Sequence, residues 1–259
     1  MKTIVTTAGR TNEQFIQKAK EIASELALSY VRRQKKSMQK LQEEQRANVL
    51  VVSKERLELY IYGSNTPFFF HPNSAAFRMK RILNGEKDLL LEALDLQQGD
   101  HFLDTTAGLC SDSILASYAV GVEGLVVACE KDEMIAYVVE RGLKAYETES
   151  MELQESMRRI HIVHQDAVDY LKRLDDNSYD VVYMDPMFEE VIEESSNFQT
   201  LRAAGVHESL SDEWIEEAKR VAKRRVVLKA HFRSPLFEKY QFEQLTRLTS
   251  KFHYGIIDI

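Results

Sequence analysis

From residue 101 onward, short apolar runs alternate with amphipathic stretches along the chain. The apolar runs are HFLD, GLVVACE, RIHIVHQD, YDVVYMD and RRVVLKA. Helical patterns such as SDSILASYAV and DEMIAYVVERGLKAY lie between most of them. Strands that are apolar on both faces and alternate with helices are typical of a parallel sheet covered on both sides. The pattern predicts an α/β fold with a mostly parallel sheet, which the stretches 240–245 and 251–259 close as late strands.

Residues 1–87 follow a different pattern, which predicts a small α+β domain. TIVTT reads as a strand, and apolar positions spaced for one buried face predict a helix from Thr11 or Asn12 to about Leu28. ANVLVV and RLELYIYG read as two further strands joined by a polar turn, and AAFRMKRILNG reads as a helix. We therefore expect two domains, residues 1–87 and residues 88–259.

The composition is that of an ordinary globular protein, with 44% hydrophobic and 29% charged residues in a chain of 259. No apolar run approaches the roughly 18–20 residues that span a bilayer, and the N-terminus lacks the apolar core of a secretory signal. The only two cysteines, Cys110 and Cys129, have no zinc-type spacing. We expect a cytoplasmic protein without a resident metal, whose cysteines are reduced and buried; a regulatory disulfide is the alternative.

The charge is divided unevenly between the two predicted domains. Residues 1–87 hold 16 Lys and Arg against 8 Asp and Glu, a net of +8, whereas residues 88–259 hold 18 against 33, a net of −15. Such asymmetry is a hint of a polyanion-binding part attached to an acidic one. Two solvated surfaces that differ in sign would give the same counts.

The segment Asp104-Thr-Thr-Ala-Gly-Leu-Cys-Ser-Asp112 follows the first predicted strand of the sheet. Ligands of open parallel sheets bind at the carboxyl ends of the strands, and small residues such as Gly108 let a ligand approach the backbone closely. The dinucleotide fingerprint GxGxxG is absent. A leading Asp104 without a glycine series disfavours phosphates and favours a cationic ligand such as S-adenosylmethionine. A tight strand–helix turn without a ligand is the alternative.

Acidic residues also follow the second and third predicted strands. Glu130 lies where α/β nucleotide folds hold ribose hydroxyls, and a carboxylate accepts two hydrogen bonds from a vicinal diol. Gln165 and Asp166 stand where a polar side chain can accept a hydrogen bond from the adenine amine. Asp166 also suits the N-cap of the following helix, and both roles are compatible.

The fourth predicted strand ends in Asp185-Pro186-Met187-Phe188. An exocyclic amine on a nucleobase is a poor nucleophile because its lone pair is delocalised into the ring. Hydrogen bonds from both amine hydrogens to the Asp185 carboxylate and the Pro186 carbonyl would pull the nitrogen toward sp3 geometry and aim its lone pair at a methyl donor. Phe188 can stack on an extruded base. A plain Asp-Pro turn is the alternative.

Further along the chain, the acidic stretch 189–209 is expected to form a loop over the substrate, as a lid or as a disordered segment. Lys229 and the cluster Lys223-Arg224-Arg225 are candidates for contacts with RNA phosphates. Cationic side chains that are merely solvated are the alternative.

These motifs together resemble the class I S-adenosylmethionine-dependent methyltransferases. Within that superfamily, the chain resembles the RsmJ-like bacterial methyltransferases, which modify guanine N2 of small-subunit ribosomal RNA. The motifs that carry this resemblance are DTTAGLCSD followed by SILAS, then YMDPMF, then RRVVLK. That family usually has Gly-Arg-Asp where this chain has Cys110-Ser111-Asp112. The resemblance implies a Rossmann-like sheet, S-adenosylmethionine as cofactor and ribosomal RNA or the small subunit as partner.

Carried over by position, the resemblance implies cofactor contacts within the four strand-end motifs and a target base that faces Asp185, Pro186 and Phe188. The expected cofactor-binding residues are Asp104, Thr106, Gly108, Ser111, Asp112, Glu130, Lys131, Asp166, Ala167 and Asp185. Two other functions fit the same sequence. One is a methyltransferase that acts on a protein or a small molecule, and the other is a non-catalytic RNA-binding protein with a vestigial cofactor pocket.

Overall fold

The computed structural model describes residues 1–186, 210–246 and 250–259, and its contacts divide the chain into two compact units. The smaller unit is built mainly on residues 1–70, and the larger unit begins at His71. The sequence predicted this boundary after residue 87. The structure places helix α3 (Asn73–Leu83) in the larger unit, where Arg78 forms ion pairs with Asp88 and Asp112.

The smaller unit holds a four-stranded sheet in the order β2-β1-β3-β4. Its strands are β1 (Thr3–Thr7), β2 (Ser29–Tyr30), β3 (Asn48–Val52) and β4 (Leu57–Tyr60). Helix α1 (Glu13–Glu25) begins where the Asn12 side chain accepts a hydrogen bond from the backbone of Phe15. The predicted helix and three predicted strands are confirmed. β2 and helix α2 (Met38–Gln45), within a segment dense in positive charge, were not predicted.

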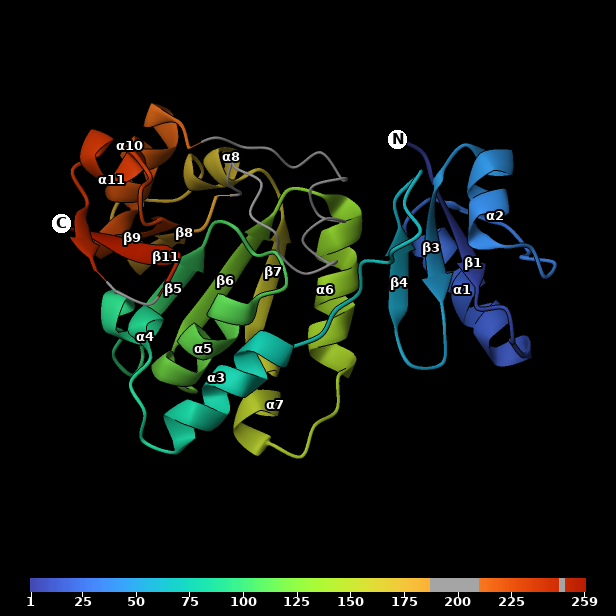
Figure 1. The fold of residues 1–259 in the computed structure, drawn as a ribbon, viewed down its shortest axis with the longest axis horizontal. Helices are drawn as coiled ribbons and strands as arrows, with labels where there is room; N and C mark the ends of the chain where they lie inside the picture. Colours follow the sequence, from blue (N-terminus) through green and yellow to red (C-terminus); the bar gives the residue numbers. More distant parts are fainter. Residues whose placement is uncertain (187–209, 247–249) are drawn as a thin grey trace. The chain divides into compact units, whose positions relative to one another are not determined.

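The larger unit is organised around a seven-stranded sheet in the order β10-β11-β9-β8-β5-β6-β7 (Figure 1). Its strands are β5 (His101–Asp104), β6 (Leu125–Glu130), β7 (Ile160–His164), β8 (Tyr179–Met184), β9 (Ala222–His231), β10 (Glu243–Leu245) and β11 (Phe252–Asp258). β9, β8, β5, β6 and β7 are parallel, and β10 and β11 are antiparallel additions at one edge. The predicted α/β sheet, including its two late strands, is confirmed.

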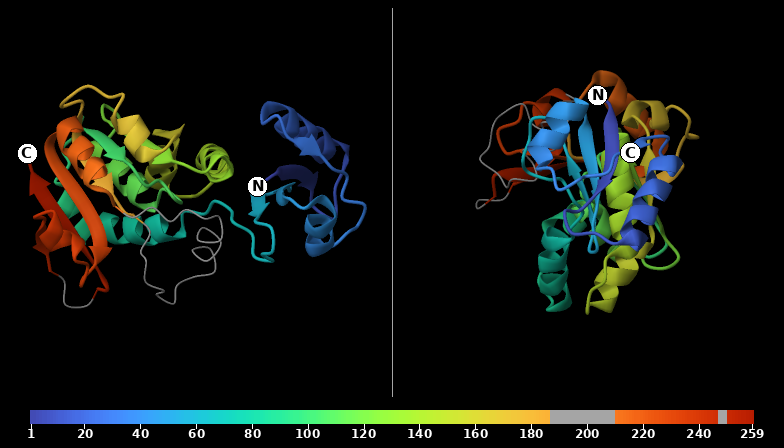
Figure 2. Two further views of the ribbon diagram at one scale, coloured as in Figure 1. Left: turned by 90° about the horizontal axis from the view of Figure 1, so that it is seen from above. Right: turned by 90° about the vertical axis from the view of Figure 1, so that its right-hand side faces the viewer.

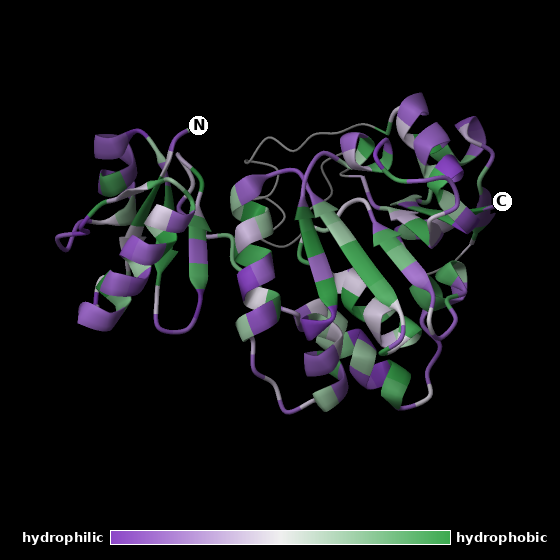
Figure 3. Cartoon of the chain, turned by 180° about the vertical axis from the view of Figure 1, so that it is seen from behind, coloured by the Kyte–Doolittle hydropathy of each residue, from purple (hydrophilic) through white to green (hydrophobic). Residues whose placement is uncertain are grey.

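Helices cover both faces of this sheet (Figures 1 and 2). They are α3, α4 (Leu89–Leu94), α5 (Ser111–Val120), α6 (Glu133–Ala145), α7 (Met151–Arg158), α8 (Ala167–Leu171), α10 (Asp212–Val221) and α11 (Leu236–Lys239). On one face, Trp214 and Ile215 of α10 pack in a core with Leu103, Val182 and Leu228 of the strands. The strands are largely apolar while the helices alternate in hydropathy, as Figure 3 shows. Burial of their apolar faces holds the layers together.

Strand alternation decides which polar side chains reach the other face. Since Leu103, Val182 and Leu228 point toward α10, Asp104, Tyr183 and Lys229 point to the opposite face, where α5 lies. β5 is bordered by β6 on one side and β8 on the other, so the strand order reverses at β5. Ligands of such sheets bind at the carboxyl ends of the strands beside this reversal.

Several features of the described residues bear on the kind of protein. Within residues 1–186, 210–246 and 250–259, no helix is long and apolar enough to cross a membrane. The same ranges contain no group of three or more His, Cys, Asp or Glu side chains that could hold a metal ion. Cys110 and Cys129 are buried and free, as predicted, and burial raises the pKa of both thiols. The stretch 189–209, expected to be either a lid or a disordered segment, lies outside the described residues.

Candidate active site

The loop after β5 is organised by the buried carboxylate of Asp104. Its Oδ1 accepts hydrogen bonds from the backbone nitrogen of Thr106 at 2.9 Å and from the Thr106 hydroxyl at 3.1 Å. Its Oδ2 accepts a hydrogen bond from the Ser113 hydroxyl in the first turn of α5. Burial raises the pKa of Asp104 to about 6, although these hydrogen bonds favour the ionised form. Asp104 therefore fixes the path of the loop from β5 into α5.

The same loop is joined to the end of β8. The Thr106 hydroxyl oxygen accepts a hydrogen bond from the backbone nitrogen of Asp185 at 2.8 Å. The loop then turns through Gly108 (φ 48°) and Cys110 (φ 56°), both in the left-handed region. That conformation favours glycine, which accounts for the glycine of the resembled family at the position of Cys110. The loop and the Asp-Pro motif thus form one hydrogen-bonded corner.

Glu130 ends β6 beside this corner, with a side chain that is almost fully buried. Its Oε1 accepts a hydrogen bond from the backbone nitrogen of Asp132 at 3.0 Å. Burial raises the pKa of Glu130 to about 7, against the backbone N–H groups of Asp132, Gly108 and Lys131. A carboxylate with this pKa changes its charge close to neutral pH.

The end of β7 carries Gln165 and Asp166. Asp166 caps α8 by accepting hydrogen bonds from the backbone nitrogens of Val168 and Asp169, and it also pairs with Lys131 at 3.0 Å. The predicted N-cap is therefore confirmed. The amide nitrogen of Gln165 is buried without a hydrogen-bond partner within the described part of the chain. An unpaired buried amide is costly, and a ligand acceptor at this position would satisfy it.

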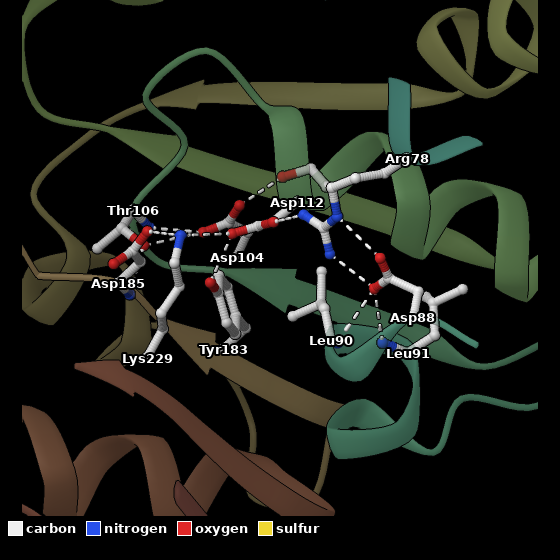
Figure 4. Close-up of polar contacts among 11 residues, drawn as sticks. Arg78, Asp88, Leu90, Leu91, Asp104, Thr106, Asp112, Tyr183, Asp185 and Lys229 are labelled. Atoms are coloured by element: carbon white, nitrogen blue, oxygen red, sulfur yellow. Dashed lines mark hydrogen bonds and ion pairs between the residues drawn. The ribbon is translucent and has the colours of Figure 1, made fainter. Parts of the chain in front are cut away.

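A chain of ion pairs connects the loop, β8, β9 and α3 (Figure 4). Lys229 Nζ lies 2.7 Å from Asp185 Oδ2 and 3.1 Å from Asp112 Oδ2. Asp112 Oδ1 accepts a hydrogen bond from Arg78 at 2.5 Å. Arg78 also donates hydrogen bonds to both carboxylate oxygens of Asp88, at 2.9 and 2.6 Å. Three carboxylates and two cations leave this network with one net negative charge.

The charge states of Asp112 and Lys229 depend on their neighbours in the network. The Tyr183 hydroxyl donates a hydrogen bond to Asp112 Oδ2 at 2.7 Å. Burial alone would raise the pKa of Asp112, but Lys229 and Arg78 outweigh it and hold that pKa well below its usual range. Burial would lower the pKa of Lys229, but Asp112 and Asp185 raise it well above its ordinary value. Asp112 and Lys229 therefore both stay charged at neutral pH.

The structure therefore brings the predicted strand-end residues to one edge of the sheet, and it adds four residues that the sequence did not single out for this site. The sequence does not point to Arg78, Asp88 or Tyr183. For Lys229 it predicts either an RNA-phosphate contact or a solvated side chain, whereas the Lys229 ammonium lies between two carboxylates. The cluster 223–225 stands at the amino end of β9, the opposite edge, and forms ion pairs with Asp180, Asp100 and Asp258. Of the Asp-Pro motif, Phe188 lies outside the described residues.

Several known proteins are similar to this chain in sequence. Residues 33–253 match a family model described as "Putative SAM-dependent methyltransferase". The chain is 46% identical to "Uncharacterized protein YpiP" of Bacillus subtilis over 98% of both chains. It is 34% identical to "Ribosomal RNA small subunit methyltransferase J" of Thioalkalivibrio sulfidiphilus, over 79% of this chain and 82% of that one.

Among solved structures, the fold is similar to a SAM-dependent methyltransferase from Neisseria gonorrhoeae. The TM-score is 0.63 with 18% identity, over 98% of this chain and 95% of that one. At this identity the likeness concerns the fold alone.

Proposed function

Because this chain belongs to the family of S-adenosylmethionine-dependent methyltransferases, we propose that it methylates an exocyclic base nitrogen of RNA, namely guanine N2 of small-subunit ribosomal RNA. Its cofactor is S-adenosylmethionine. The observation that carries the proposed acceptor is the Asp185-Pro186 corner, which hydrogen bonds tie to the loop after β5.

The residues at the strand ends fit this cofactor. Glu130 offers a buried carboxylate for the ribose diol, and Gln165 offers a buried amide nitrogen that lacks a partner in the described structure, where adenine would lie. The ion-pair network has one net negative charge, and S-adenosylmethionine has one net positive charge from its sulfonium, ammonium and carboxylate groups. When bound, the cofactor supplies an electrophilic methyl group on a sulfonium.

The chain's own residues would position and polarise the acceptor. Asp185 and the Pro186 carbonyl would accept hydrogen bonds from the two amine hydrogens of the base. Lys229 fixes the Asp185 carboxylate at one oxygen, and Thr106 fixes the Asp185 backbone, so the acceptors are in place before the base arrives. Alignment of reacting groups supplies a large share of the rate in such transfers. Ser111, Asp112, Lys131 and Ala167 complete the proposed cofactor contacts.

The smaller unit is proposed to hold the polyanion. It contributes part of the predicted basic region, 12 Lys and Arg against 7 Asp and Glu in residues 1–70. The relatives named as ribosomal RNA methyltransferases support RNA over a protein or small-molecule acceptor.

The test is the substitution Asp185→Ala, assayed with radiolabelled S-adenosylmethionine on small subunits from cells that lack this protein. We expect methyl transfer to fall below detection while the circular dichroism spectrum stays unchanged. Asp258→Ala is the matched control, since it removes an ion-paired carboxylate at the opposite edge of the same sheet and should leave turnover unchanged. Undiminished turnover by Asp185→Ala, or labelled methyl found elsewhere than in RNA, would overturn the proposal.

A further inference from the structure

His231 is the last residue of β9, the strand that carries Lys229, and Phe232 and Arg233 follow it; these three residues are here called the aromatic platform. Phe232 is 38% exposed although Phe is a residue that proteins usually bury. The His231 ring lies 4.6 Å from it between centroids, and the Arg233 guanidinium lies 4.9 Å from its centroid. An exposed ring flanked by an imidazole and a guanidinium is thus presented at the carboxyl end of β9.

The backbone under the platform is fixed. The nitrogen of Phe232 donates a hydrogen bond to the carbonyl of Lys251 at 3.0 Å, and the carbonyl of Phe232 accepts one from the Gln244 side chain at 2.9 Å. The nitrogen of Ser234 closes the turn onto the His231 carbonyl at 2.8 Å. The backbone that carries the ring is therefore held on both sides, and the ring itself lies 5.9 Å from that of His253 between centroids, which lowers the entropic cost of binding a partner.

The platform lies at the edge of the sheet where the candidate active site stands. Lys229 bonds Asp185, and His231 is two residues further on, so both side chains point to the same face of β9. Phe232 is three residue steps beyond Lys229, roughly 10 Å of chain, and it lies in the turn beyond the end of β9 that the Ser234–His231 hydrogen bond closes. A polymer whose one base enters the Asp185 corner would carry a neighbouring base within reach of Phe232.

Charge distinguishes this aromatic pair from another on the surface of the larger unit. Arg233 is exposed, and no carboxylate pairs with it in the part of the chain that the structure describes. On α3, the exposed ring of Phe77 also lies near a guanidinium, that of Arg81 at 5.9 Å, but Arg81 is neutralised by Glu86 at 2.6 Å. Only the first pair combines an exposed ring with a positive charge that a phosphate could meet.

We propose that the aromatic platform is a second RNA subsite, where the nucleobase next to the target stacks on Phe232 and its phosphate contacts Arg233. This inference rests on the proposed function, because it assumes an RNA substrate at the Asp185 corner. Aromatic rings bind single-stranded nucleic acid in this way because every base has a flat π face, and arginine adds a cationic contact.

The test measures binding of the full-length protein to a fluorescein-labelled single-stranded RNA of 15 nucleotides by anisotropy, over a range of salt concentrations. Phe232→Leu keeps the apolar surface but removes the π face, and it should weaken binding roughly tenfold. Phe232→Tyr should bind as the wild type does. Arg233→Gln should weaken binding and make its salt dependence shallower by about 0.7 in log–log slope, as expected for one phosphate contact with a single strand. Phe77→Ala is the matched control and should change nothing.

Three outcomes would overturn the proposal that the aromatic platform binds RNA. They are no salt-dependent RNA binding by the wild type, wild-type affinity in both Phe232→Leu and Arg233→Gln, or a loss of RNA affinity in Phe77→Ala as large as that in Phe232→Leu. Melting temperatures of all variants exclude unfolding as the cause. The rate of methyl transfer to small subunits then distinguishes the proposed RNA subsite from the proposed function. If Phe232→Leu raises KM for RNA and leaves kcat unchanged, both proposals stand. If the binding changes are as expected but neither the wild type nor any variant methylates RNA, Phe232 and Arg233 still form an RNA-binding site, and the proposed function fails.

Discussion

The substitution Glu130→Gln tests the proposed ribose contact through its pH dependence. The ionised carboxylate accepts hydrogen bonds from the two ribose hydroxyls more strongly than the protonated acid does, and burial raises the pKa of Glu130 to about 7. At pH 6 about one tenth of the free protein would have Glu130 ionised, against most of it at pH 8. The Kd of the wild type for S-adenosylmethionine should therefore be about tenfold higher at pH 6 than at pH 8.

In Glu130→Gln this difference should disappear, because the amide does not titrate. The affinity at pH 8 should also fall by roughly tenfold or more, since hydrogen bonds to a charged group contribute about 1.5–3 kcal/mol. Isothermal titration calorimetry at both pH values measures both effects. Glu133→Gln, which removes an exposed carboxylate three residues further on, is the control and should behave as the wild type.

The same pKa predicts an effect on the stability of the free protein. The folded-state pKa of about 7 lies above the ordinary value of 4.5, so the folded chain binds the proton more tightly than the unfolded chain. Its contribution to stability is fully present below pH 4.5 and is lost as the pH rises through about 7, a loss of about 3 kcal/mol at about 1.4 kcal/mol per tenfold change in proton affinity. Asp104, with a pKa of about 6, acts in the same direction at lower pH.

Urea unfolding at pH 6 and pH 8 measures the last part of this loss, about 1.4 kcal/mol. The wild type should lose stability between the two values, and Glu130→Gln should lose clearly less. A wild-type Kd that is equal at the two pH values, together with equal stability losses in wild type and variant, would refute the reasoning.

Two further substitutions test the ion-pair network and the core on opposite faces of the sheet. Lys229→Met should destabilise the protein by about 2 kcal/mol, less than the 3–5 kcal/mol of a fully buried pair because Lys229 and Asp185 are 23% and 26% exposed. It should also lower kcat for RNA methylation, and recovery of both properties in Lys229→Arg would show that the charge is responsible. Trp214→Ala should cost about 3–5 kcal/mol in urea unfolding, since the ring is 2% exposed. It should leave the Kd for S-adenosylmethionine unchanged, because Trp214 packs on the face away from Asp112; a large loss of affinity would contradict that separation.

The sheet could be predicted from the sequence because each strand carries its own signal. HFLD and YDVVYM are apolar on both faces, and the residue that follows each strand lies at the ligand-binding edge whatever the rest of the chain does. Asp104, Glu130 and Asp166 could be placed at that edge for this reason. The short strand β2 and helix α2 could not be predicted from the sequence, because their residues show little apolar periodicity and are ordered by packing on β1 and β3.

The ion-pair network could not be predicted for a different reason. Arg78 lies 34 residues from Asp112 along the chain, and Lys229 lies 117 residues from it. Contacts between residues so far apart in sequence leave no local sequence pattern. An isolated lysine at the end of a strand is therefore expected to be solvated. Only the register of β9 beside β8 places Lys229 opposite Asp185, and only the packing of α3 on α5 brings Arg78 to the loop.

The charges of that network explain why the site can be both buried and ready for a cationic ligand. A carboxylate pair such as Asp112 and Asp185 would repel each other and favour protonation if buried alone. Lys229 lies between them and Arg78 lies beyond Asp112, and these two cations hold the pKa of Asp112 well below its usual range. With Asp88 included, the formal charges of the network leave one negative charge uncompensated. Among these largely buried groups the effective dielectric constant is lower than in water, so this residual charge would attract a sulfonium more strongly than a neutral site would. S-adenosylhomocysteine has the same groups without the sulfonium charge, so the same field disfavours the product relative to the substrate and promotes its release after methyl transfer.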